Sequence, residues 1–227
     1  MANVVTMGTF FPRRVSEYCP AMQYSANVNY NGVTRVSFGA ATLASATYFL
    51  NATSVATGTN VQSATMLNAA TVPEPFGRAL QYVCSAANAT ALTVDGWDYL
   101  GQPMSETVTL AGATPVIGNK AFKYIRQVTY VAAAVTLSIG TSTKLGLPYK
   151  TIRVEWETAD QIVAAAGTLA APVLTDPQVV TSGDPRGTYI PTTTPNGVII
   201  ITAALDCIND VNAAGNGGLH GIAQFTN

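Results

Sequence analysis

The chain has 227 residues, of which only 10% are charged, against roughly 25% in a typical soluble domain. Its 11 basic and 12 acidic residues leave a net charge of −1, which argues against a basic surface able to neutralise many phosphates. The composition therefore predicts no nucleic-acid partner. A small net charge together with 48% apolar residues favours association with other proteins.

The sequence shows no sign of secretion, membrane insertion or metal binding. Residues 1–6 contain no basic segment followed by an apolar run, so no signal peptide is expected. The most apolar runs, 162–174 and 198–205, are shorter than the ~18 residues that a membrane span needs. The only histidine is His220, and the three cysteines are widely spaced, which predicts buried thiols and no zinc site, other metal or cofactor.

Residues 1–32 are expected to form an extended arm that packs on a partner. Turn-forming residues interrupt any regular element there, whereas the aromatic side chains need a surface to cover them. Arg13 and Arg14 fit a solvated or interface pair better than a cleavage or nucleic-acid site. The protein-interface candidates in the arm are Phe10, Phe11, Arg13, Arg14 and Tyr18.

The Ala/Thr/Ser-rich segment that follows is less regular. Residues 33–38 alternate as in a strand, 40–51 fit either a helix or a strand, and 53–62 are expected to form a loop. The Pro-Glu-Pro-Phe-Gly run at 73–77 is interpreted as a junction. The predicted organisation is an N-terminal arm and segment over 1–75 and a β core with a C-terminal tail over 76–227.

From residue 78 onward, strand signals recur every 10–15 residues with glycine turns between them. The predicted strands lie within 80–84, 91–94, 104–110, 121–130, 135–139, 151–157 and 197–205. This spacing predicts an all-β fold, a sandwich or barrel-like domain, with at most one or two short helices. One such helix is expected at 159–166.

Side-chain alternation adds finer predictions. Met104, Glu106 and Val108 share one face of their strand, and a slip near Ile125 indicates a β-bulge. In 151–157, the residues expected to face inward are Ile152, Val154 and Trp156, and those expected to face outward are Arg153, Glu155 and Glu157.

The acidic residues do not form a recognisable catalytic or metal-binding motif. Asp95 and Asp98 flank Trp97 and are expected to shape a turn rather than act as an acid–base pair. Asp206 and Asp210 lack the spacing of an EF-hand calcium site. His220 has no evident acid or nucleophile to work with and is interpreted as a polar loop residue.

The segment 181–191 is expected to be an ordered loop with an Arg–Asp corner at Asp184-Pro-Arg186. Arg186 can clamp a carboxylate or several carbonyls through its planar guanidinium. Two interpretations remain open for Arg186, a structural staple within the chain and an inter-subunit contact, and it is kept as a further interface candidate.

Three stretches resemble virion structural proteins of tailed bacteriophages. They are Asp98-Tyr-Leu-Gly-Gln-Pro-Met-Ser-Glu-Thr107 with Gly118–Ile125, Thr143-Lys-Leu-Gly-Leu-Pro-Tyr149, and Gly183-Asp-Pro-Arg-Gly-Thr-Tyr-Ile-Pro191. Residues 1–75 lie outside the resemblance, and no stretch is a chemical motif. The resemblance implies a non-enzymatic virion protein, most like a capsid decoration (cement) protein.

The resulting hypothesis is a homo-oligomer, such as a dimer or trimer, that binds the major capsid protein on the outer surface of the head and bridges capsomers. It would be assembled in the host bacterial cytoplasm and would have no nucleic-acid or membrane partner. One alternative is a tail tube, baseplate or adaptor subunit. A second alternative is a carbohydrate-binding host-recognition module, with Trp97, Tyr99 or Trp156 stacking on sugars.

Overall fold

The computed structural model describes residues 30–55, 58–85, 91–132, 135–173 and 176–209, and every regular element in these ranges is a β-strand. All strand pairs are antiparallel, which confirms the predicted all-β class. The strands are β1 (Tyr30–Gly39), β2 (Ser45–Val55), β3 (Gly58–Ser63), β4 (Arg78–Cys84), β5 (Ala91–Trp97), β6 (Pro103–Thr109), β7 (Val116–Phe122), β8 (Tyr124–Ala132), β9 (Val135–Gly146), β10 (Thr151–Ala159), β11 (Ile162–Ala164), β12 (Thr168–Ala170), β13 (Thr188–Ile190) and β14 (Ile201–Asn209).

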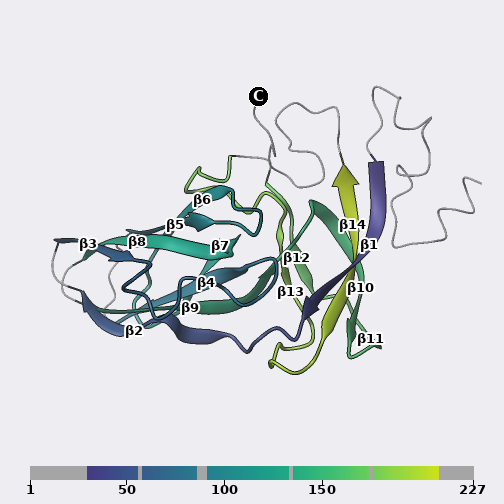
Figure 1. Ribbon diagram of the computed structural model, residues 1–227, viewed down its shortest axis with the longest axis horizontal. Coiled ribbons are helices and arrows are strands. Elements are labelled where there is room, and N and C mark those ends of the chain that lie inside the picture. The colour runs from purple at the N-terminus through teal and green to yellow at the C-terminus, as the bar shows by residue number, and fades with distance from the viewer. Residues whose placement is uncertain (1–29, 56–57, 86–90, 133–134, 174–175, 210–227) are drawn as a thin grey trace, which may run out of the picture.

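The strands form three sheets. Sheet A has the order β1-β14-β10-β11, and sheet C has the order β3-β8-β5-β6. Sheet B has the order β12-β13-β9-β4-β7, with β2 also pairing with β9. In Figure 1 sheet A stands steeply at one end of the molecule, whereas the long strands of sheets B and C run across the other side. Strands from the predicted N-terminal segment therefore pair with strands of the predicted core: β1 with β14, β2 with β9 and β3 with β8.

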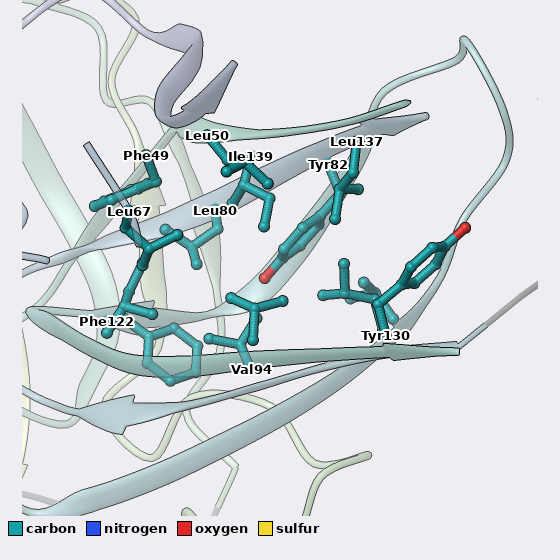
Figure 2. Close-up of a cluster of buried hydrophobic side chains, with 14 of the residues drawn as sticks. Phe49, Leu50, Leu67, Leu80, Tyr82, Val94, Phe122, Tyr130, Leu137 and Ile139 are labelled. Carbon is teal, nitrogen blue, oxygen red and sulfur yellow. The ribbon is translucent and has the colours of Figure 1, made fainter. Parts of the chain in front are cut away.

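Two hydrophobic clusters hold the sheets together. The larger lies between sheets B and C, where Leu80 and Tyr82 from β4 and Val94 from β5 point into the same interior (Figure 2). The smaller lies between sheet A and the β9–β13 part of sheet B, and it includes Phe38 stacked on Tyr189 with ring centroids 5.8 Å apart. Strand β9 contributes to both clusters and so links them. As predicted, Cys84 and Cys207 are buried, one in each cluster, while Cys19 lies outside the described residues.

The segment over 40–62 is more regular than predicted. Residues 45–55 form a strand, which settles the helix-or-strand ambiguity of 40–51. The prediction of a loop at 53–62 is wrong. Strand β3 pairs with β8 along its whole length, from Gly58 opposite Ala132 to Ser63 opposite Gln127. Cross-strand pairing gives this Thr- and Asn-containing run a strand conformation that its local composition did not indicate.

Two predictions for β10 and the residues after it are also wrong. Ile152 is 42% exposed and Glu157 is fully buried, because the β10–β14 pairing contains two register shifts, at Thr151/Arg153 and Val154/Trp156. Each shift moves the inside–outside alternation by one residue. The helix expected at 159–166 is instead the hairpin to β11, whose two turn residues Asp160 and Gln161 have positive φ of 47° and 69°.

Two finer predictions from side-chain alternation are confirmed. Met104, Glu106 and Val108 are all buried on one face of β6, as their alternation predicted. The slip near Ile125 is a register shift, because Asp95 pairs with Gln127 whereas Gly96 pairs with Ile125. Arg126 is therefore the additional residue of a β-bulge in β8.

Candidate functional site

The stretches 98–107, 143–149 and 183–191 meet at a buried polar junction. Arg186, from the 183–191 loop, forms an ion pair with Asp98 at 2.8 Å, and its Nε donates to the Leu147 carbonyl at 3.1 Å. The hydroxyl of Tyr99 donates to the Pro148 carbonyl at 2.6 Å. The guanidinium of Arg186 also lies over the Tyr99 ring, 5.0 Å from its centroid. One loop thus fixes the two other stretches against each other.

Asp98 performs the turn role predicted for it. Its Oδ1 accepts the backbone N–H groups of Leu100 and Gln102, both at 2.8 Å, which is an Asx-type turn. Its Oδ2 accepts from Arg186, so both carboxylate oxygens are satisfied. Asp95 does not share that role: it lies within β5, where Ser105 and Gln127 donate to it.

Asp184 completes the junction through backbone hydrogen bonds, whereas Arg186 forms its ion pair with Asp98. Its Oδ1 accepts the backbone N–H of Arg186 at 2.9 Å, and its Oδ2 accepts that of Ala121 at 3.0 Å. Burial raises the pKa of Asp184, while the nearby Arg186 charge and these N–H groups oppose the rise. Because Arg186 is 1% exposed and bound within the chain, its environment favours the staple interpretation over an inter-subunit contact.

A second buried carboxyl, Glu106, lies on β6. The backbone N–H of Asn119 donates to its Oε1, whereas its Oε2 is buried without a hydrogen bond. Burial raises the pKa of Glu106 to about 7, against opposition from the Asn119 N–H and the charge of Lys120. A Cβ at Gly118 would overlap Oε2, so this glycine leaves room for the carboxyl. The sequence indicated the burial of Glu106 only through the alternation of β6, which places it on the same face as Met104 and Val108.

Lys120 anchors a loop across the edge of β6. Its Nζ donates to the carbonyls of Ser105, Pro177 and Val179 at 2.7, 2.7 and 2.8 Å. Burial lowers its pKa to about 8, with the charge of Glu106 opposing that shift. The buried charged side chains of this region therefore join loops to strands. Their hydrogen bonds are made to groups of the same chain.

The described residues contain no group of three or more His, Cys, Asp or Glu side chains placed to hold a metal ion. No helix long and apolar enough to cross a membrane occurs in the part of the chain that the structure describes.

Four large aliphatic side chains that are each more than half exposed lie at one end of sheet A. Ile162 and Val163 on β11 are each 74% exposed, and Val198 and Ile200, just before β14, are 75% and 51% exposed. Asp160 joins the two segments: its N–H donates to the Ile200 carbonyl at 3.0 Å, and its Oδ1 accepts the Ile200 N–H at 2.8 Å. We call these four side chains the apolar tip; β11, which carries two of them, lies at the lower end of sheet A in Figure 1.

The sequence did not identify the apolar tip, although the consecutive pair Ile162-Val163 beside a turn was a usable signal. Among the predicted interface residues, only Arg186 lies in the described part of the chain. Phe10, Phe11, Arg13, Arg14 and Tyr18 lie outside it, as do Asp210 and His220. Asp206 lies 3.6 Å from Arg153 in an ion pair on sheet A.

No protein-family model, curated protein or solved structure was found to match the chain.

Proposed function

We propose that this chain is a virion structural protein of a tailed phage that binds the outer surface of the capsid and stabilises the head by bridging capsomers. The observation that carries the proposal is the apolar tip, in which Ile162, Val163 and Val198 are each about three-quarters exposed. Exposed aliphatic side chains at one end of a sheet are a candidate surface for a partner to cover. The resemblance of 98–107, 143–149 and 183–191 to virion proteins supports the capsid as that partner.

The proposed mechanism depends on repetition. Burying one exposed aliphatic side chain contributes about 1.5–3 kcal/mol, but association costs roughly 4–15 kcal/mol in lost freedom of motion. A tip of four side chains therefore gives a weak contact by itself. A homo-oligomer would present several tips at once, and repeated contacts over a lattice raise the overall affinity without stronger individual contacts. Binding only the expanded lattice would stabilise that lattice by mass action. A low net charge of −1 suits a protein that is covered in an assembly.

The test is co-sedimentation of the full chain with undecorated, expanded phage heads. We expect saturable binding at fixed lattice positions, lost in the double variant Ile162→Thr/Val163→Thr. The control is Val61→Thr, which changes an aliphatic side chain on β3 that is 48% exposed and lies away from the tip. Equal binding by both variants would contradict a role for the tip.

The same preparation tests the alternative of a tail component. Absence of binding to heads, together with rings or tubes formed by the purified protein alone, would replace the decoration proposal with a tail tube, baseplate or adaptor role. Electron microscopy of the unbound fraction distinguishes these outcomes.

A further inference from the structure

A cleft of about 260 Å³ opens where β5 and β6 meet on sheet C. Its walls include Asp95 and Trp97 from β5, Pro103 and Ser105 from β6, Arg126 from the bulge of β8, and Gln178 from the loop that Lys120 anchors. Asp95 pairs with Ser105 and Trp97 pairs with Pro103 across the two strands, so these four residues are in register. The cleft is separate from the buried junction and from the apolar tip.

The carboxylate of Asp95 is held in place before any ligand arrives. Asp95 Oδ1 accepts from Ser105 Oγ at 2.6 Å, and Asp95 Oδ2 accepts from Gln127 Nε2 at 2.9 Å. Arg126 Nη2 lies 3.7 Å from Asp95 Oδ2, and its side chain is 56% exposed. Since each carboxylate oxygen can accept more than one hydrogen bond, Asp95 keeps capacity for a ligand. Sites built on strands in this way are better preorganised than sites on loops.

The chemistry of the walls indicates the class of ligand. Trp97 and Pro103 offer apolar surfaces, whereas Asp95 accepts hydrogen bonds and Arg126 and Gln178 donate them. The charges of Asp95 and Arg126 offset each other, so the cleft does not select an ionic ligand. Hydroxyl groups beside an apolar C–H face match this combination. We propose that the cleft binds a residue of a neutral saccharide.

The same geometry argues for binding without hydrolysis. Glycoside hydrolysis ordinarily uses two carboxyl groups that flank the scissile bond. Asp95 is the one acidic residue among those that line the cleft. Its neighbour in sequence, Asp98, is buried against Arg186 and is committed to a turn. The cleft is therefore a saccharide-binding site, and this inference does not depend on capsid attachment.

Tryptophan fluorescence gives a direct test, because the chain has only two tryptophans. Trp156 lies on β10 of sheet A, where Arg35 lies 5.8 Å from its ring centroid. The variant Trp156→Phe leaves Trp97 as the only tryptophan, and Trp97→Phe leaves only Trp156. The probes are cellotriose, maltotriose and triacetylchitotriose. We expect a saturable change with a Kd of about 1 mM for at least one probe in Trp156→Phe and no change in Trp97→Phe.

A matched pair of arginine variants tests the polar contacts. Arg126 and Arg153 are both exposed and lie 3.7 and 3.6 Å from an aspartate, but only Arg126 lines the cleft. We expect Arg126→Met to weaken binding about tenfold, because a hydrogen bond to a charged group is lost, and Arg153→Met to bind like the unchanged chain. Circular dichroism checks that each variant is folded.

Saturation-transfer NMR on the unchanged chain makes the result independent of any variant. A transfer signal from one of the three probes, competed by excess of the same saccharide, supports the site. Absence of a saturable signal with all three probes by both methods would overturn the proposal, as would unchanged affinity in folded Arg126→Met.

Discussion

The Arg186 guanidinium lies 2.8 Å from the carboxylate of Asp98, which is 88 residues earlier in the chain, and the two side chains are 1% and 2% exposed. This pair joins the 183–191 loop to the end of β5. Removing one partner of a buried ion pair leaves an uncompensated charge, which costs about 3–5 kcal/mol. The pair is therefore expected to contribute strongly to holding the 183–191 loop against residue 98.

Asp98→Asn tests that role, because asparagine keeps an oxygen for the Leu100 and Gln102 N–H groups but removes the charge. We expect the free energy of unfolding to fall by about 3–5 kcal/mol in urea titrations. Arg153→Met, which removes the ion pairs of a 66% exposed arginine with Glu155 and Asp206, should cost less than about 1 kcal/mol. Equal losses of unfolding free energy in the two variants would show that the buried Asp98–Arg186 pair stabilises the fold no more than an exposed pair.

Glu106 should make the stability depend on pH. Burial raises its pKa from 4.5 to about 7, so between these values the folded state holds a proton that the unfolded state has lost. The free energy of unfolding should therefore fall as pH rises from about 4.5 to about 7, by about 3 kcal/mol in total from this group. Glu106→Gln mimics the protonated carboxyl and should remove that part of the slope.

Urea unfolding of the unchanged chain and Glu106→Gln at several pH values measures the difference in slope. The groups that act on Glu106 include Lys120, Lys144 and Tyr82, and all are retained in the variant. Glu155→Gln, at a side chain that is 31% exposed, serves as the control and should keep the original slope. A Glu106→Gln profile parallel to that of the unchanged chain would refute the prediction.

Gly140 on β9 lies directly against the backbone of β2. A Cβ at this position would lie 2.7 Å from the Ala46 Cα and closer still to the Ser45 carbonyl oxygen. Because the obstacle is backbone, Gly140→Ala should cost about 3 kcal/mol and lower the thermal midpoint clearly. Gly39→Ala is the comparison: it has open space but a φ of +67°, so it should cost only about 1–2 kcal/mol. The opposite ranking would count against the steric explanation.

Tyr189 links sheet B to a buried carboxylate of sheet A. Its hydroxyl donates to Glu157 Oε2 at 2.6 Å and accepts the Gly167 N–H at 2.7 Å, and burial raises its pKa. Tyr189→Phe leaves both partners short of a hydrogen bond and should cost about 2–3 kcal/mol in chemical denaturation. Tyr124→Phe, at a residue that is 42% exposed, should change stability by less than about 0.5 kcal/mol. If the two variants lost the same free energy of unfolding, the Tyr189 hydroxyl would contribute little to stability.

Features that depend on neighbouring residues could be predicted from the sequence. Alternation in 104–110 correctly placed Met104 and Glu106 on one buried face, and glycine turns between short apolar runs predicted the all-β class. The turn at Asp98 followed from the hydrogen-bonding habit of a short carboxylate side chain. These features were predictable because sheet periodicity and turn chemistry act over only a few residues.

Features that depend on distant partners could not be predicted from the sequence. The register shifts in β10 buried Glu157 and exposed Ile152, and pairing with β8 made 58–63 a strand. The cleft at Asp95 and Arg126 exists because a bulge in β8 meets two other strands and a loop that Lys120 holds in place. The register of each strand, and which segments meet at the cleft, depend on which strands pair. The free energy that selects those pairings comes from contacts between residues far apart in the chain.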